Sequence, residues 1–364
     1  MKKGSMDYTI LFVTLVLTAF GVIMVYSASF YEQGLLGDSA YYFRRQLGWA
    51  GVGLVMMLVA SRIDYKIYGR KPLPFVFLVL GFVLLIGVLV FGSEINYTKR
   101  WFMIGGVSVQ PAEIAKLCLI LFMAASLSQN KNVKSFWFGV LPYLVLAAGY
   151  AGLIFLQPNF STTVTIMMIA VAMLVAAGVR IWQLGLMGLA GAGVAAMLLF
   201  KADDYRMERI ETFLDPFADP SGSGYQVIQS LYSLGAGGLF GLGLGQSRQK
   251  FLYLPYRESD FVFAILGEEL GFIGAMVIIV LFAILCWRGL RIAMMVPDAF
   301  GSLLATGIVC IIAIQTIINI AVVSGAIPAT GLPLPFISAG GSSLAIFMTS
   351  IGILLNISKQ IRKA

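Results

Sequence analysis

A group of charged side chains flanks an apolar segment in YLPYRESDFVFAILGEELG, residues 253–271. These side chains are Arg257, Glu258, Asp260, Glu268 and Glu269. The 364-residue chain contains no histidine, which excludes imidazole acid–base chemistry, serine–histidine nucleophiles and histidine metal ligands. Proton transfer must therefore use a carboxylate, a lysine, a tyrosine or water. Asp260, directly before the apolar run FVFAIL, is a candidate base, because partial burial makes a carboxylate more basic.

A second charged pair, Glu113 and Lys116, falls within an apolar segment. The spacing of three residues places both side chains on one face of a helix. Ionisable groups inside a membrane segment are costly and usually functional. Two opposite charges can also form a purely structural pair, and the sequence leaves both alternatives open.

The composition defines the environment in which these residues act. The chain is 59% hydrophobic and only 12% charged, with a mean hydropathy of +0.91, whereas soluble domains contain about 25% charged residues. This predicts an all-α polytopic membrane protein, because a helix of about 20 apolar residues spans a bilayer. We expect ten spans, near residues 8–27, 45–60, 74–91, 112–127, 137–156, 161–178, 182–200, 262–287, 301–323 and 342–357.

The basic residues predict the orientation of these spans, because short cytoplasmic loops are rich in Lys and Arg. With a cytoplasmic N-terminus, the inner segments carry fourteen basic residues and the short outer loops carry four. The four outer residues are Arg44, Arg45, Lys99 and Arg100. Both termini are therefore predicted to be cytoplasmic. The net charge of +8 follows mostly from this asymmetry and implies no nucleic-acid partner.

Two irregular regions are expected on the outer face. Residues 201–261, between the seventh and eighth spans, are too long for a simple connection and predict a folded cap within a single membrane domain of residues 1–364. Residues 331–343, GLPLPFISAGGSS, contain too many helix breakers for a lipid-facing helix and predict a re-entrant loop buried in protein. The Gly-rich run 238–250 lacks the spacing of a phosphate-binding loop.

Arginine offers paired donors that fit phosphate groups, and several arginines are expected on the outer side. They are Arg45, Arg100, Arg248 and Arg257. Arg45 and Arg100 form the preferred pair, because each lies just before or at the start of a span. These residues predict a site for an anionic headgroup.

The chain resembles the SEDS family (shape, elongation, division and sporulation proteins) over nearly its whole length. Five segments carry the resemblance, in the order RWFMIGGVSVQPAEIAKL, QPNFSTT, GYQVIQSLYSLGAGGLFGLGLGQSRQKFLYLP, SDFVFAILGEELGFIG and LPFISAGGSS. The run GLGLGQSRQKFLYLP is more similar to the division and sporulation branch, FtsW and SpoVE, than to the elongation protein RodA. Ala112, Asn159 and Ala339 depart from the Ser, Asp and Tyr that are usual in the family.

The resemblance implies a peptidoglycan glycosyltransferase that polymerises lipid II on the outer face of the bacterial cytoplasmic membrane. It also implies a partner, a class B penicillin-binding protein, which cross-links the strands. The T-D-F motif of the family carries an aspartate that is regarded as essential for polymerisation. Asp260, in Ser-Asp-Phe, is the matching residue.

The implied reaction needs a base for a sugar hydroxyl and positive charge for the departing lipid pyrophosphate. Asp260 is expected to be the general base, with a helix N-cap as its structural alternative. Lys116 joins the four outer arginines as a candidate substrate contact. A divalent cation, Mg²⁺ or Mn²⁺, could bridge pyrophosphate to a carboxylate, although no ligand spacing requires one. The expected supporting residues are Glu113, Glu268, Glu269, Gln110, Ser342 and Ser343.

Glu268 and Glu269 are expected to stabilise the bundle. If residues 260–271 form one helix, Glu268 lies ~80° around from Asp260 and two turns deeper, and Glu269 lies about opposite. Either glutamate could pair with a buried cation such as Lys116.

Other functions stay open. Ten spans with broken helices and intramembrane charges also suit a flippase for a lipid-linked precursor. A scaffold for division partners would leave the environment of Asp260 without a purpose. An elongation-type polymerase would share the chemistry and differ in the process that it serves.

Overall fold

The computed structural model describes residues 5–95, 98–180 and 211–361, with positions 182, 183, 185, 187, 188 and 191 between them. Its long helices coincide with nine of the ten expected spans, and the expected span 182–200 lies mostly outside the described residues. These nine helices are α1 (Tyr8–Leu35), α2 (Tyr41–Arg62), α3 (Leu73–Phe91), α4 (Pro111–Gln129), α5 (Leu141–Phe155), α6 (Phe160–Ala176), α10 (Val262–Met295), α11 (Ala299–Val323) and α12 (Gly341–Ser358). Among the described residues, seven helical segments are long and apolar enough to cross a membrane.

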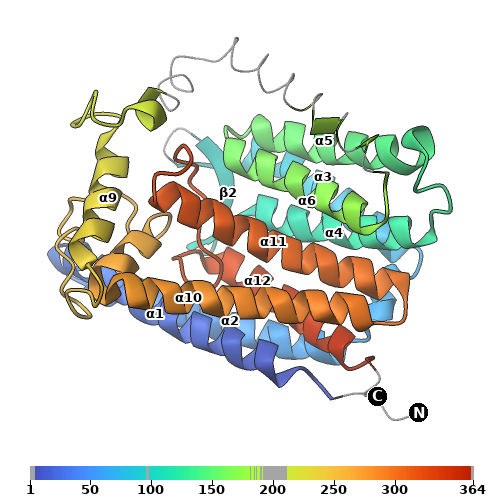
Figure 1. Cartoon of the computed structure of the whole chain (residues 1–364), viewed down its shortest axis with the longest axis horizontal. Coiled ribbons are helices and arrows are strands. Elements are labelled where there is room, and N and C mark those ends of the chain that lie inside the picture. The colour runs from blue at the N-terminus through green and yellow to red at the C-terminus, as the bar shows by residue number, and fades with distance from the viewer. Residues whose placement is uncertain are drawn as a thin grey trace.

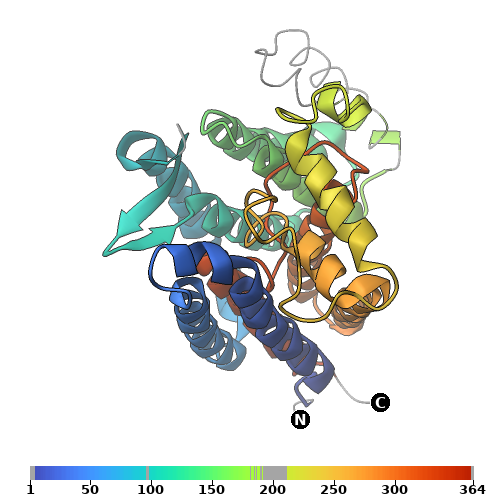
Figure 2. The ribbon, with the colours of Figure 1, turned by 90° about the vertical axis from the view of Figure 1, so that its left-hand side faces the viewer.

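The helices lie side by side and form one bundle (Figure 1). α2 packs on α12, α3 on α4, α5 on α6, and α10 on α11. A further helix, α9 (Tyr225–Gly237), crosses one end of the bundle and packs on α10. Figure 2 looks onto this end, with α9 and the loops around it in front of the bundle. The described part of the expected cap, 211–261, therefore covers one end of the molecule.

A small antiparallel sheet between α3 and α4 corrects the expectation of an all-α chain. Its strands are β1 (Ser93–Ile95), β2 (Thr98–Ile104) and β3 (Val107–Val109), in the order β1-β2-β3. Ile104 pairs with Val107 across a two-residue turn at Gly105 and Gly106. Both glycines have positive φ, 58° and 81°, as a tight hairpin turn requires. The Gly-Gly pair between apolar residues was the signal for this hairpin.

Helix α10 is interrupted at Gly271, where φ is 68° and ψ is −170°. This break leaves backbone N–H and C=O groups on both sides without helical hydrogen-bond partners. Residues 238–243 provide the missing partners. The hydrogen bonds run from Phe272 N to Gly238 O (2.8 Å), from Ile273 N to Leu239 O (3.1 Å), from Leu242 N to Glu268 O (3.0 Å) and from Gly243 N to Glu269 O (3.0 Å). The Gly-rich loop is therefore bonded directly into the broken helix.

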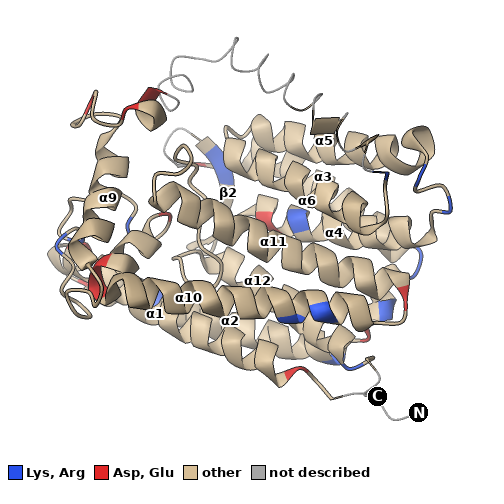
Figure 3. Ribbon diagram, viewed as in Figure 1, with Lys and Arg blue, Asp and Glu red and all other residues tan. Residues whose placement is uncertain are grey.

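The break divides α10 into two parts with different surroundings. Residues 262–269 are all buried, whereas exposed positions recur throughout 272–295. The second part is ~36 Å long at about 1.5 Å per residue, enough by itself for the ~30 Å hydrocarbon layer. Acidic residues mark the end of α10 beside α9, and basic residues lie toward its other end (Figure 3). The first part of α10 therefore belongs to the cap, and the expected span 262–287 shifts toward the C-terminus.

The predicted re-entrant loop is confirmed as buried irregular backbone. Residues 328–340 form no helix or strand, and Leu332, Leu334, Phe336 and Ile337 are buried. At Gly21 of α1, an added Cβ would lie 2.4 Å from the carbonyl oxygen of Phe336. The absence of a side chain at this position lets the loop lie directly on α1.

Substitution of Gly241 tests the contact between the loop and the broken helix. Gly241 has a φ of 80°, and an added Cβ would lie 2.2 Å from Glu269 O and 2.6 Å from Gly271 N. Gly241→Ala should therefore cost about 2 kcal/mol or more, seen as a lower unfolding temperature of the purified protein in detergent. Gly48→Ala is the matched control, because its Cβ meets nothing within 4 Å. Equal unfolding temperatures for the two variants would contradict the role of this contact.

Candidate active site

The loop that carries Asp260 is held through its backbone. Three successive carbonyl oxygens, from residues 258, 259 and 260, accept hydrogen bonds from the re-entrant loop and from α11. Their donors are Ala339 N to Glu258 O (2.8 Å), Ser338 Oγ to Ser259 O, and Asn319 Nδ2 to Asp260 O (2.8 Å). Asn319 also donates to Leu332 O at 2.7 Å, which ties the two loops together. These bonds hold the backbone of the Asp260 loop against the re-entrant loop and α11.

Asp260 lies half-buried at the start of the first part of α10. The N-cap of α10 is Phe261, whose side chain makes no capping hydrogen bond. The N-cap alternative for Asp260 is therefore wrong. An added Cβ at Gly331 would lie 3.4 Å from Asp260 Oδ2, so the re-entrant loop directly borders the carboxylate.

Glu268 is the main acceptor for the loop after α9. Its carboxylate accepts hydrogen bonds from Arg248 N (2.8 Å), Gln249 N (3.4 Å), Ser233 Oγ (3.0 Å) and Ser247 Oγ. Several donors thus satisfy the oxygen atoms of this buried carboxylate, which would be costly to leave unpaired. Glu268 thus holds α9 and the loop after it against the first part of α10.

Glu269 connects the same loop to α1. Its carboxylate accepts hydrogen bonds from Ser27 Oγ (2.6 Å) and Ser247 N (3.3 Å), and it pairs with Lys250 Nζ (3.3 Å). The expectation that Lys116 pairs with Glu268 or Glu269 is therefore wrong, because Lys250 supplies the cation. Both glutamates meet at Ser247, where the loop wraps around the broken end of the helix.

Lys116 forms a separate buried network. Its Nζ donates to Glu113 Oε1 at 2.7 Å and to Gln315 Oε1 at 3.0 Å, and its side chain is fully buried. Glu113 Oε2 and Gln315 Nε2 are buried and have no hydrogen-bond partner within the described part of the chain. The structure brings α4 and α11 together through this network, and a substrate contact by Lys116 stays a prediction.

The preferred arginine pair is assembled around the small sheet. Arg45 of α2 donates to Ser108 Oγ of β3 at 2.7 Å. Arg100 of β2 donates to Gln157 O at 3.1 Å and to Pro158 O, in the turn between α5 and α6. Both guanidinium groups are thus positioned by one hairpin that the sequence analysis missed. Their contact with pyrophosphate stays a prediction.

The other two predicted arginines differ in exposure. Arg257 is buried and donates to Ala28 O at 3.0 Å, to Leu254 O at 3.3 Å and to the Glu32 carboxylate. It therefore links the Asp260 loop to α1, and its guanidinium points inward. Arg248 is exposed and keeps its side chain on the surface of the cap.

The remaining supporting residues join two helix ends. Gln110 N, at the start of α4, donates to Ser342 Oγ, in the first turn of α12, at 3.1 Å. Ser342 and Ser343 are both buried directly after the re-entrant loop. This contact fixes one end of that loop.

Glu258 is a residue whose role the sequence analysis missed. Its Oε2 atom is buried and has no hydrogen-bond partner among the described residues, two positions from Asp260. Burial raises the pKa of its carboxyl, the nearby Arg257 lowers it, and Glu32 raises it further, with a net shift upward. The pattern R-E-S-D gave no warning of this, because the burial of a side chain depends on the tertiary structure.

The fold and this arrangement define a class: a polytopic membrane protein with a carboxylate held at one end of the bundle, beneath a folded cap. A family model for FtsW/RodA/SpoVE cell cycle proteins matches residues 7–363. The chain therefore belongs to the FtsW/RodA/SpoVE family.

Relatives agree over the full length. Stage V sporulation protein E of Bacillus subtilis is 44% identical, covering 99% of each chain. The probable peptidoglycan glycosyltransferase FtsW of Trichlorobacter lovleyi is 42% identical, covering 100% of this chain and 96% of its own.

Two solved structures are similar. One is described as "Structural coordination of polymerization and crosslinking by a peptidoglycan synthase complex", with a TM-score of 0.80, 28% identity and 97% coverage of both chains. The other is the rod shape determining protein RodA of Thermus thermophilus, with a TM-score of 0.71, 26% identity and 98% coverage of both chains.

Removal of one partner tests the Lys116 network. Lys116→Met leaves the Glu113 carboxylate buried without its cation and should cost about 3–5 kcal/mol. The double variant Glu113→Leu/Lys116→Met should recover most of this loss, because two apolar side chains need no partners. Thermal unfolding of the purified variants in detergent measures both. Equal unfolding temperatures for the single and the double variant would show that the pair is not coupled.

The raised pKa of Glu258 predicts a pH dependence of stability. The folded state holds this proton more tightly than the unfolded state, so the stabilisation is complete below about pH 4.5, the ordinary pKa, and is lost as the pH rises through the raised pKa. Glu258→Gln mimics the protonated form and should remove this loss. Unfolding temperature against pH measures it, with Glu94→Gln, an exposed carboxyl, as control. An unchanged pH profile in Glu258→Gln refutes the prediction.

Proposed function

We propose that this protein is a peptidoglycan glycosyltransferase that polymerises lipid II, with Asp260 as the general base. The observation that carries the proposal is the three-carbonyl hydrogen bonding of residues 258–260, which positions Asp260 half-buried at the start of α10, beside the re-entrant loop. Together with the names of the relatives, this favours the polymerase over the flippase.

The proposed reaction joins two lipid-linked sugars. The Asp260 carboxylate takes the proton of a sugar 4-hydroxyl, whose oxygen attacks the anomeric carbon of the other substrate. The bond to the lipid pyrophosphate breaks, and the pyrophosphate leaves with the electron pair. Arg45, Arg100 and Arg248 would provide positive charge at the Asp260 end of the bundle, where it would stabilise the leaving group.

A divalent cation fits this scheme only in part. Among the residues that the structure describes, no cluster of three or more His, Cys, Asp or Glu side chains could hold a metal ion. A Mg²⁺ or Mn²⁺ ion would therefore take most of its oxygen ligands from the pyrophosphate and from water, with one carboxylate from the protein.

The proposal places the Asp260 end of the bundle on the outer face of the bacterial cytoplasmic membrane. The distribution of basic residues supports this placement, because it predicts ten spans with cytoplasmic termini. The similar solved structure is described as a peptidoglycan synthase complex that polymerises and cross-links. A class B penicillin-binding protein is accordingly the proposed partner, and division or sporulation is the proposed process.

Reconstitution with purified lipid II tests the role of Asp260. Asp260→Ala should lower the rate of glycan formation by about 10²-fold or more, the usual contribution of a general base. Asp260→Asn should lose as much, because the amide keeps the shape but cannot accept the proton. Asp38→Asn, in an exposed pair with Arg44, is the control.

Two outcomes would contradict the proposal. Normal polymerisation by Asp260→Asn would remove the general-base role. Transfer of lipid II across the bilayer by the wild-type protein, without any polymer, would support the flippase instead.

A further inference from the structure

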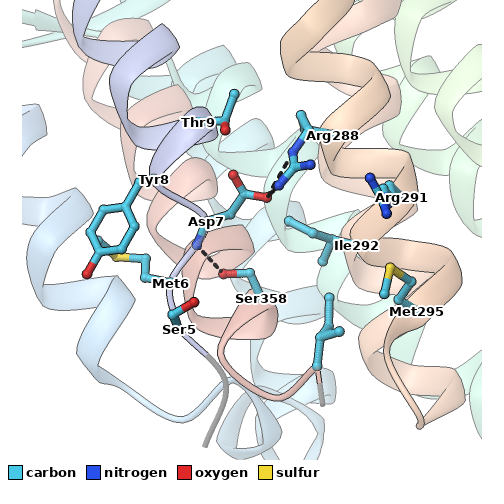
Figure 4. Close-up of a pocket in the computed structure, with 11 residues that line it drawn as sticks. Ser5, Met6, Asp7, Tyr8, Thr9, Arg288, Arg291, Ile292, Met295 and Ser358 are labelled. Atoms are coloured by element: carbon cyan, nitrogen blue, oxygen red, sulfur yellow. Dashed lines mark hydrogen bonds and ion pairs between the residues drawn. The ribbon is translucent and has the colours of Figure 1, made fainter. Parts of the chain in front are cut away.

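A cavity of about 390 Å³ lies at the end of the bundle away from Asp260. It is formed where the start of α1, the last turns of α10 and the end of α12 meet (Figure 4). Asp7 precedes the first residue of α1, whereas Arg257, near Asp260, contacts Ala28 toward the other end of the same helix. The cavity and the candidate active site are therefore separated by most of the length of α1.

The walls of the cavity are held by Asp7. Its Oδ2 accepts hydrogen bonds from Arg288 Nη2 (2.6 Å) and Nε (3.1 Å), and its backbone N–H donates to Ser358 Oγ at 3.1 Å. Its Oδ1 accepts from Ile10 N at 3.2 Å and caps α1. One residue thus joins three helices, so the cavity is formed without a ligand.

Two arginines line this cavity, and Asp7 forms an ion pair with only one of them, Arg288. The positive charge of Arg291 is not neutralised by Asp7. In the described part of the chain, no carboxylate oxygen lies within 4.0 Å of its guanidinium, whereas Arg288 is paired. Its guanidinium lies over the ring of Trp287, with Cζ 5.9 Å from the ring centroid. The described lining therefore carries two arginines and one carboxylate, which leaves it with net positive charge.

An exposed apolar stripe runs beside this charge. Trp287, Leu290 and Met294 of α10 are 57%, 43% and 78% exposed, and their spacing places them on one face of the helix. Tryptophan is enriched where the hydrocarbon layer meets the headgroups. The stripe thus places Arg291 at the depth of lipid phosphates, with room for acyl chains along α10.

We propose that this cavity binds the phosphate of an anionic phospholipid, with Arg291 as its main charge, Arg288 beside it, and the acyl chains against Trp287, Leu290 and Met294. Arginine binds phosphate through paired charge-assisted hydrogen bonds. The volume is within the range of small-ligand sites. A free phosphate ion would find the same charge but would leave the apolar stripe unused. The site goes beyond the proposed function and does not depend on it.

Thermal unfolding of the purified full chain in a neutral detergent tests the proposal. Added phosphatidylglycerol should raise the unfolding temperature, because a ligand that binds only the folded state stabilises it, and phosphatidylcholine should not. Arg291→Gln should raise the half-saturating concentration of phosphatidylglycerol about tenfold or more, the usual effect of losing a charged hydrogen bond. Arg62→Gln, an exposed basic residue at the end of α2, is the matched control and should leave it unchanged.

Three results would overturn the proposal. An equal rise in the half-saturating concentration of phosphatidylglycerol for Arg62→Gln would indicate unspecific attraction between the lipid and basic residues. An equal shift with inorganic phosphate alone would indicate a free anion rather than a lipid. An unchanged response in Arg291→Gln would exclude the cavity. Polymerisation of lipid II in detergent should be normal in Arg291→Gln, so failure here and failure of the Asp260 assignment are distinguishable.

Discussion

A helix that breaks inside a protein must find new partners for its backbone groups, and this constraint organises the Asp260 end of the bundle. At Gly271 the helical hydrogen bonds of α10 are interrupted. Four hydrogen bonds with residues 238–243 replace them. Unpaired buried backbone groups are costly, so the break and the loop can form only together. Glycines at 241 and 271 permit the close approach that these bonds require.

The charged residues of the cap follow from this arrangement. The first part of α10 ends at Gly271, so Glu268 and Glu269 lie in its last turn, where the loop after α9 turns around the helix end. There they accept hydrogen bonds from the Ser247 hydroxyl and from three backbone N–H groups of the loop, at residues 247, 248 and 249, and Glu269 pairs with Lys250. Further along the chain, the re-entrant loop and Asn319 hold the carbonyls next to Asp260. The loop that carries the candidate base is thus positioned by hydrogen bonds to its backbone carbonyl groups.

Hydrophobic patterning predicted the described helices well, because lipid-facing and buried helices both need long apolar runs. Breakers in residues 331–343 correctly predicted irregular backbone. The hairpin at Gly105 and Gly106 was missed although its turn signal was present. The expected pairing of Glu268 or Glu269 with Lys116 was wrong, because Lys116 pairs with Glu113, and the cation beside Glu269 is Lys250 from a loop that wraps around the helix end.

The sequence by itself determined the family, the membrane class and the identity of Asp260 as the candidate base. These follow from composition and from motifs whose residues are local in the chain. Only the tertiary structure decided which charges meet: Lys250 with Glu269, Lys116 with Glu113 and Gln315, and Arg257 with Glu32. Most of these partners are far apart in sequence, so their pairing depends on how helices pack and where one of them breaks.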